Sequence, residues 1–97
     1  MLDKRKFYIN GQWVEPSKKN DFDVINPSDE TVCAVISLGS QEDTNAAVTA
    51  AREALPSWSN SSKEDRVALL ERLYSIYERR MDEMAEVISI EIGRAHV

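Results

Sequence analysis

The sequence predicts an α+β chain in which β-hairpins occupy residues 7–38 and helices occupy residues 41–92. Short aromatic and β-branched runs separated by turn residues fill the first half, as is typical of strands. In the second half, apolar residues at helical spacing follow two serine-led helix starts. The 97 residues allow one small domain, so we expect residues 1–97 to form a single unit.

The first hairpin is predicted around the dipeptide Asn10-Gly11. This pair separates the runs Phe7–Ile9 and Gln12–Val14, which are both rich in aromatic and β-branched residues. Asn and Gly both tolerate positive φ angles, so the pair suits a two-residue type I′ turn. A tight antiparallel hairpin is therefore expected at residues 7–14.

A second hairpin is predicted between residues 22–26 and 31–38, joined by the turn residues 27–30. Pro27 ends the first of these strands because proline lacks an N–H and disfavours a helical residue before it. In the second strand, residues at period two share a face, and the apolar set on that face is Val32, Ala34, Ile36 and Leu38.

The first helix is predicted to begin after Ser40, where Asp43 completes a pattern like a capping box. It should run to about Leu55, because Pro56 disfavours continuation. Its buried stripe consists mostly of alanines, which allow close approach of a neighbour but remove little apolar area from water: Ala47, Ala50, Ala51 and Ala54.

The second helix is predicted to begin after Ser62, with acidic residues in its first turn. Asp82 is expected to be a new N-cap or a kink, and Gly93 suits the end of the last helix. The apolar positions recur at helical spacing along one face: Val67, Leu70, Leu73, Tyr74, Tyr77, Met81, Ala85, Ile88 and Ile92.

Composition excludes several classes of function. The net charge of −5 argues against nonspecific binding to nucleic acid or to an anionic membrane surface. No apolar run is long enough for a transmembrane helix, so no membrane partner is expected. The single cysteine cannot form an internal disulfide, which suits a reducing cytoplasm.

Taken in order, the motifs resemble the N-terminus of the NAD(P)-dependent aldehyde dehydrogenase superfamily. The aromatic hairpin is followed by the run Phe22-Asp23-Val24-Ile25-Asn26-Pro27-Ser28. Further short motifs then follow in the family's order: Glu30-Thr31-Val32, Gly39-Ser40-Gln41-Glu42-Asp43, Ala47-Val48, Ala50-Ala51-Arg52, Ser57-Trp58, Arg66 and Glu91-Ile92-Gly93. The resemblance implies the peripheral start of a Rossmann-like α/β fold, in which such elements wrap the cofactor-binding domain.

The resemblance also implies an activity for the full enzyme, which is the oxidation of an aldehyde to a carboxylic acid with NAD or NADP. Family members continue for several hundred residues, so we expect this chain to be a truncated N-terminal fragment whose partner is the remainder of the dehydrogenase. The full-length family is expected to form homo-oligomers. The family's nucleophilic cysteine, general-base glutamate and cofactor residues lie beyond this chain, so the fragment is expected to bind no cofactor and to be inactive alone.

Two residues invite a catalytic or metal role; Cys33 is assigned a structural role instead, and His96 is assigned no zinc site. Cys33 lies in the middle of a strand with no glycine or basic residue beside it, and the family's nucleophile comes much later in a glycine-rich context. His96 is the single histidine and has no second ligand at zinc spacing.

One candidate site follows from the resemblance. Some aldehyde dehydrogenases bind a structural monovalent cation through backbone carbonyls just before the Asn-Pro pair and an acidic side chain just before a glycine that ends a helix. The matching positions are Val24, Ile25 and Glu91, and oxygen ligands suit Na⁺ or K⁺. The alternative is that Glu91 is a capping or surface carboxylate.

A different class of function remains open at this point. The chain can be interpreted as a stand-alone α+β interaction module, in which Tyr8, Trp13 and the alanine-lined helix form the interface. Cooperative unfolding of a monomer would favour the module, whereas order that appears only with the rest of a dehydrogenase would favour the fragment.

Overall fold

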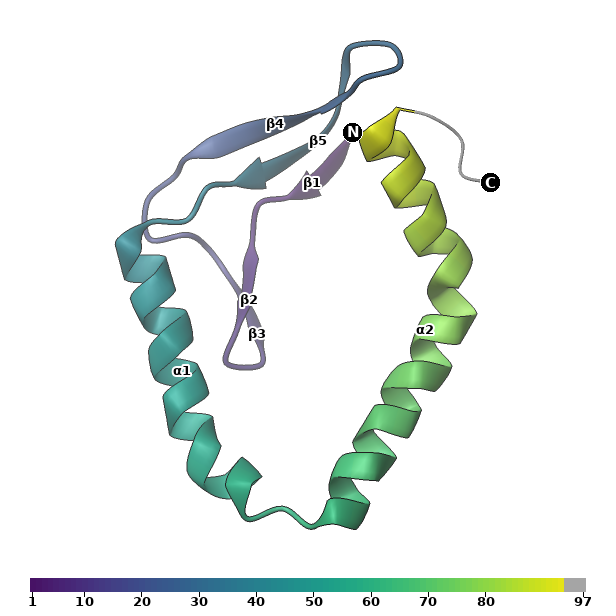
Figure 1. Ribbon diagram of the computed structural model, residues 1–97. Helices are drawn as coiled ribbons and strands as arrows, with labels where there is room; N and C mark the ends of the chain where they lie inside the picture. The colour runs from purple at the N-terminus through teal and green to yellow at the C-terminus, as the bar shows by residue number, and fades with distance from the viewer. Residues whose placement is uncertain (94–97) are drawn as a thin grey trace.

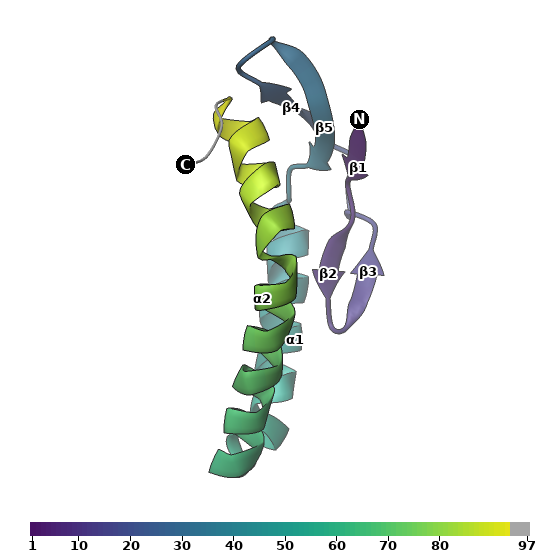
Figure 2. The same cartoon turned by 90° about the vertical axis from the view of Figure 1, so that its right-hand side faces the viewer.

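The computed structural model describes residues 1–93, which form an open frame (Figure 1). The strands lie at one end of the frame, and two long helices run from them and meet at the opposite end. Seen at right angles, both helices lie in one layer, with a β-hairpin to one side of it (Figure 2). The elements are β1 (Leu2–Lys4), β2 (Phe7–Ile9), β3 (Gln12–Val14), β4 (Asp21–Asn26), β5 (Thr31–Ser37), α1 (Gln41–Ser59) and α2 (Lys63–Ile92).

The first hairpin has the predicted turn. Asn10 and Gly11 have φ angles of 54° and 74°, as a type I′ turn requires, and β2 pairs antiparallel with β3. Tyr8 lies opposite Trp13, and their rings meet edge to face with centroids 5.1 Å apart. The prediction for residues 7–14 is confirmed.

The second predicted hairpin, β4 and β5, belongs to a three-stranded sheet in the order β1-β5-β4. The register shifts between Val24, which pairs with Ala34, and Ile25, which pairs with Val32, so Cys33 is the extra residue of a bulge. This bulge interrupts the alternation predicted for residues 31–38, and β5 ends at Ser37.

The strand β1 was not predicted. Its three residues pair in parallel with β5, Leu2 lying opposite Ala34. A parallel pairing needs a long connection and leaves no turn signal beside the strand. A run of one apolar and two charged residues carries no periodicity of its own.

The helix α1 begins with the predicted capping box. The Ser40 side chain accepts a hydrogen bond from the Asp43 backbone N–H at 3.4 Å, and the Asp43 carboxylate accepts one from the Ser40 N–H at 2.9 Å. The same carboxylate accepts a bond from the Ser17 N–H at 2.9 Å, which attaches the loop after β3 to the helix. These N–H donors, that of Ser40 first, lower the pKa of Asp43 below 3.8.

The predicted end of α1 near Leu55 is wrong, because the helix continues through Pro56 to Ser59. Proline removes one N–H, and the serines around it supply other donors to carbonyls of the last turns. The Ser57 hydroxyl donates to the Ala54 carbonyl at 3.1 Å and the Ser59 hydroxyl to the Pro56 carbonyl at 3.0 Å.

Of the two alternatives for Asp82, the new N-cap is wrong, since α2 is one helix of 30 residues with Asp82 in its interior. Neither Pro nor Gly interrupts Lys63–Ile92, so one exposed aspartate does not end the helix. Both predicted ends hold: Ser62 accepts a bond from the Asp65 N–H at 3.1 Å, and Gly93 closes the helix with a φ of 85°.

The frame lacks an apolar core among residues 1–93. No hydrophobic side chain there is buried, and the one buried polar residue is Ser37, with 8% of its surface exposed. The accessible surface is 8268 Å², whereas a folded 11.0 kDa protein exposes about 5,600 Å². The radius of gyration is 17.2 Å, against about 12.5 Å for a compact chain of this length. Each element therefore shows a face that further protein would normally cover.

Capping should matter unusually for α1, because no residue of this helix is buried. We expect Ser40→Ala to destabilise the helix by about 0.5–2 kcal/mol, through loss of the oxygen that accepts the Asp43 N–H. Ser40→Asp keeps a capping oxygen and should be close to neutral. NMR Cα shifts of residues 41–47 would report the change, and equal helicity in the two variants would contradict a role for the cap.

Candidate functional site

The candidate cation ligands come from two elements that meet at one end of the frame. The helix α2 contacts β4. Its closing residue Gly93 lies against the turn that follows β4, so close that a Cβ on Gly93 would be 3.0 Å from Pro27 Cβ and from Ser28 N. Val24 and Ile25 lie in β4 just before this turn, and Glu91 lies just before Gly93. Figure 1 shows the end of α2 beside the sheet. The structure therefore brings the two elements that carry these residues together.

The structure gives the surroundings of two of the candidate cation ligands. The Val24 carbonyl accepts a hydrogen bond from the Cys33 thiol at 3.3 Å, and a carbonyl oxygen has a second lone pair. The Glu91 side chain is exposed. No group of three or more His, Cys, Asp or Glu side chains gathers within residues 1–93, so a site here would depend on backbone carbonyls and a single carboxylate.

Cys33 has a structural environment. It is the extra residue of the bulge, it is half-buried, and its thiol donates to the Val24 carbonyl of the neighbouring strand. A nucleophilic cysteine needs an exposed position and groups that stabilise its thiolate. Neither a basic side chain nor a helix N-terminus is among its recorded hydrogen-bond partners, so the thiol here serves the strand pairing.

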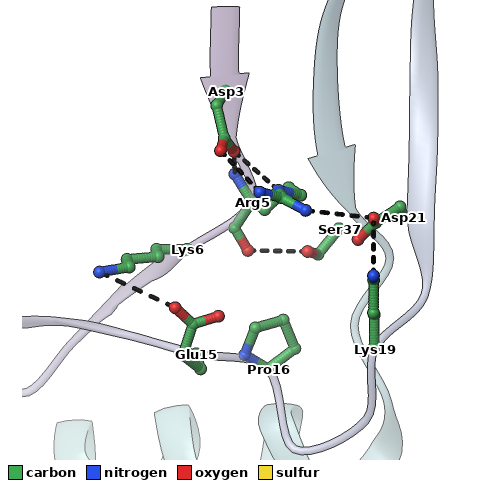
Figure 3. A pocket seen from close by; sticks show the side chains of 8 residues that line it. All are labelled: Asp3, Arg5, Lys6, Glu15, Pro16, Lys19, Asp21 and Ser37. Atoms are coloured by element: carbon green, nitrogen blue, oxygen red, sulfur yellow. Dashed lines mark hydrogen bonds and ion pairs between the residues drawn. The ribbon is translucent and has the colours of Figure 1, made fainter.

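A polar cluster, which we call the polar clasp, surrounds Arg5 in a hollow of about 340 Å³ (Figure 3). Two nitrogens of the Arg5 guanidinium donate to the two Asp3 carboxylate oxygens, both at 2.8 Å, and a third donates to Asp21 at 3.4 Å. Lys19 approaches the same Asp21 oxygen at 3.9 Å. The Ser37 hydroxyl donates to the Arg5 carbonyl at 2.7 Å. The clasp thus joins the chain after β1 to the start of β4 and the end of β5.

The charges of the clasp are matched, which leaves little for chemistry. The hydrogen bonds from Arg5 lower the pKa of Asp3, and the two carboxylates raise the pKa of Arg5. The pKa values of Asp3 and Arg5 are therefore moved further from neutral pH, and both groups stay charged there. A general acid or base needs a pKa near the working pH, so the clasp has the properties of a structural contact.

A second structural residue is Arg66, which the sequence analysis named only among the motifs of the family resemblance. Its guanidinium donates to the carbonyls of Ser59 at 3.1 Å and Ser61 at 3.2 Å, and it lies 5.9 Å from the centre of the Trp58 ring. The last turn of α1 has no basic residue of its own, so Arg66 supplies the cation that its terminal carbonyls favour. Only the folded corner between α1 and α2 shows this.

Two further expectations concern the chain's surroundings. His96, which was given no zinc role, lies outside the described residues. Within residues 1–93, neither helix has the length and apolar character required to cross a membrane.

The comparison with protein families gives one match, in which the model of the aldehyde dehydrogenase family covers residues 13–96. Among curated proteins, a 3-succinoylsemialdehyde-pyridine dehydrogenase of a Pseudomonas species is 45% identical over 93 residues, which is 96% of this chain and 20% of that protein.

The solved structures give the same result. Aldehyde dehydrogenase of Bartonella henselae has 49% identity and a TM-score of 0.93, with 96% of this chain and 20% of that one covered. A mutant of aldehyde dehydrogenase C from Pseudomonas syringae, in complex with NAD⁺ and octanal, has 39% identity and a TM-score of 0.89 over 92% of this chain and 18% of that one. The strands and helices match the N-terminal part of these structures, and the chain spans about one fifth of the length of its relatives.

The clasp gives a testable prediction for acid pH. Arg5 lowers the pKa of Asp3 in the folded chain. The stabilisation from this pair is therefore fully present at pH values above the ordinary carboxyl pKa of 3.8, and it is lost as the pH falls through the lower pKa of the folded state. Arg5→Gln should raise the Asp3 pKa toward 3.8, as measured by NMR titration of the carboxyl carbon. Lys6→Gln, which removes a smaller contribution to the same shift, should change it less. An Asp3 titration unaffected by Arg5→Gln would contradict the clasp.

Proposed function

The chain belongs to the aldehyde dehydrogenase family, and we propose that it forms the N-terminal part of an NAD-dependent enzyme that oxidises an aldehyde to a carboxylic acid. The observation that carries this proposal is the 49% identity and TM-score of 0.93 over 96% of the chain to the Bartonella henselae aldehyde dehydrogenase. The cofactor bound by the whole enzyme accepts the hydride that the aldehyde loses. NAD is favoured over NADP because the Pseudomonas syringae structure holds NAD⁺.

The contribution of this chain is structural in the proposal, and the chain is inactive alone. The thiol of Cys33 bonds to a strand carbonyl, and the charges of the clasp neutralise one another. The recorded partner of the Cys33 thiol is therefore a backbone carbonyl and not a general base. The residues here hold the strands and helices that the rest of the enzyme packs against, while the reacting groups come from that remainder.

The exposed surface favours this proposal over a stand-alone interaction module. A module presents one patch and keeps a core of its own, whereas no hydrophobic side chain is buried in residues 1–93. Tyr8 and Trp13, the residues suggested for a module interface, are 63% and 67% exposed, and many aliphatic residues on other elements are comparably exposed. The apolar surface is thus spread over the whole frame.

Further properties of the whole enzyme follow as proposals from the family resemblance. The enzyme forms homo-oligomers, and its remaining polypeptide is the direct partner of this segment. We place it in the cytoplasm because its one cysteine within the described chain is a free thiol held in the sheet.

The monovalent cation is proposed as a structural ligand held by the Val24 and Ile25 carbonyls and the Glu91 carboxylate. The packing of Gly93 against Pro27 and Ser28 supports it, because this contact joins the two elements that carry the ligands. None of these three ligands is a group that would react with a substrate, so the cation would affect the stability of the fold and not the reaction.

The activity proposal can be tested with a chimera in which this chain replaces the corresponding segment of the Bartonella henselae enzyme. We expect the chimera to reduce NAD⁺ when given an aldehyde such as octanal, while the 97-residue chain alone produces no NADH. The host enzyme with its nucleophilic cysteine replaced is the control for background reduction. A folded but inactive chimera, or NADH production by the chain alone, would overturn the proposal.

The cation proposal makes a separate prediction in the same chimera. Its melting temperature should be higher in K⁺ than in tetramethylammonium at equal ionic strength, and Glu91→Gln should remove this difference. Equal ionic strength is required because salt screening alone changes stability. Glu86→Gln, an exposed carboxylate on the same helix, is the matched control and should keep the difference. Equal melting temperatures in both salts would leave Glu91 as a surface carboxylate.

A further inference from the structure

The turn Asn10-Gly11 places an amide side chain directly before an unhindered main-chain nitrogen. The Asn10 side chain ends in an amide carbon that a nucleophile can attack, and the next main-chain nitrogen belongs to Gly11, which has no side chain to obstruct it. Both residues are exposed, and a Cβ added to Gly11 would meet no atom within 4 Å. The two groups are therefore neighbours in the chain with open space around them.

Neither of these groups is held by a hydrogen bond in the described part of the chain. The Asn10 side chain has no hydrogen-bond partner among residues 1–93. The strand pairing ends with Ile9 opposite Gln12, so the Gly11 N–H lies beyond the last paired residues of the hairpin. Because this N–H donates to no acceptor within residues 1–93, its nitrogen is available as a nucleophile when it loses its proton.

The other four asparagines lack this combination, and two of them are blocked by the backbone around them. Asn26 precedes Pro27, whose nitrogen carries no hydrogen to lose. Its side-chain oxygen also accepts bonds from the Ser28 N–H at 3.0 Å and the Ser28 hydroxyl at 2.8 Å. Asn45 lies inside α1, where the N–H that follows it belongs to the helical hydrogen bonds, and its side-chain oxygen accepts a bond from the Gln41 amide at 2.9 Å.

The remaining two asparagines are restrained by the residue that follows each of them. Asn60 caps the end of α1, and the next N–H, that of Ser61, donates to a carbonyl of the last turn of this helix at 3.0 Å. Asn20 precedes Asp21, the first residue of β4, whose side chain hinders the nitrogen and whose carboxylate opposes a negative charge on it. Among the asparagines, all of which lie in the described chain, Asn10 alone joins a free amide to an unhindered and unbonded nitrogen.

The hairpin can open at low cost, which a reaction between these two groups requires. Rotation about the Asn10 Cα–C bond must carry the Gly11 nitrogen onto the amide carbon, out of the type I′ geometry. The strands β2 and β3 have three residues each and form a two-stranded sheet of their own, which is marginally stable by itself. Their turn borders a hollow of about 520 Å³ beside α1, and Figure 2 shows it at the end of the hairpin far from the other sheet. The turn therefore has room to rearrange.

We propose that Asn10 is a modification site, at which the chain deamidates spontaneously through a succinimide. The deprotonated Gly11 nitrogen attacks Asn10 Cγ, so that a bond forms between them. The bond from Cγ to Nδ2 breaks, and the side-chain nitrogen takes up the proton and leaves as ammonia. Water then opens the ring: cleavage of the new bond gives aspartate at residue 10, and cleavage of the bond to the Asn10 main-chain carbonyl gives isoaspartate. The co-reactant is water, and nothing is oxidised or reduced.

The two products have different effects on the hairpin. Aspartate leaves the main chain unchanged, and Asp-Gly suits a type I′ turn as Asn-Gly does. Isoaspartate directs the main chain through Cβ and Cγ, so the turn gains one main-chain atom and the register set by a two-residue turn is lost. The edge-to-face contact of Tyr8 and Trp13, with centroids 5.1 Å apart, is then released. The reacting and affected groups all lie within residues 7–14, so this inference stands apart from the proposed function.

The test incubates the 97-residue chain in mildly alkaline buffer and follows the tryptic peptide of residues 7–18 by mass spectrometry. We expect a mass increase at residue 10, where a carboxylate replaces the amide, in two products that separate by chromatography. A protease that cleaves before aspartate should cut one product at residue 10 and leave the other intact. Asn10 should react about tenfold or more faster than any other asparagine, which corresponds to a barrier lower by about 1.4 kcal/mol. Another asparagine that reacts first would overturn the site.

Two variants test the role of the turn. Gly11→Asn keeps a residue that tolerates positive φ but adds a side chain beside the nitrogen, and Asn10→Gly removes the reacting amide while keeping the turn. Both variants should show no loss of the Tyr8–Trp13 ring contact in NMR spectra during the incubation, whereas the isoaspartate form of the unchanged chain should lose it. A ring contact that persists in the isoaspartate form would overturn the release of the hairpin.

Incubation in urea separates the effect of the structure from that of the sequence. The rate at Asn60 should rise in urea, because unfolding releases the Ser61 N–H from its carbonyl partner. The rate at Asn10 should stay nearly the same, because its groups are already free in the folded chain. A rise at Asn10 as large as that at Asn60 would show that the hairpin protects this turn, and it would overturn the proposal that the folded chain reacts there.

Discussion

The absence of a buried apolar side chain in residues 1–93 is the constraint on which the rest of the structure depends. Without a core, the corners of the frame are set by polar contacts. Asp43 joins the loop after β3 to the start of α1, Arg5 joins β1 to β4 through Asp21, and Arg66 closes the corner between the helices. Hydrogen bonds fix direction well but add little net stability when water competes for the same groups. The polar contacts therefore define the shape of the frame, while its apolar side chains stay exposed to solvent.

Local polar contacts set the shape of this segment, whereas its stability depends on covering its apolar surface, and this difference fits a segment that packs against a larger body. Large hydrophobic side chains are exposed on its strands and on both helices, and its shortest extent is 15 Å, so it suits a position against a larger body. The carboxylates with shifted pKa values, such as Asp3 and Asp43, are stabilised in the charged form by hydrogen-bond donors of the scaffold, and Arg5 is stabilised as a cation by its carboxylate partners. Such groups hold loops and strands in place, and proton transfer near neutral pH requires a different environment.

The bulge at Cys33 connects the strand pairing with the candidate cation site. The extra residue in β5 places a thiol against the Val24 carbonyl, and the next residue of β4, Ile25, precedes the turn on which Gly93 packs. Glycine is required at this point for two reasons, since its φ is 85° and a Cβ would lie 3.0 Å from Pro27. The end of α2 and the end of β4 are thereby held at a separation that a side chain would increase.

The sequence by itself determined the features that neighbouring residues decide. The turn at Asn10-Gly11, the caps at Ser40 and Ser62, and the closing Gly93 were predictable because each depends on backbone geometry within a few residues. The family followed from the order of these motifs. Only the tertiary structure decided the pairing of β1 with β5, the matched charges around Arg5 and the capping of α1 by Arg66, because those partners are distant in sequence or meet only at a folded corner. Even the candidate ligands Val24, Ile25 and Glu91 were proposed by resemblance, and the packing of Gly93 on Pro27 is what brings their elements together.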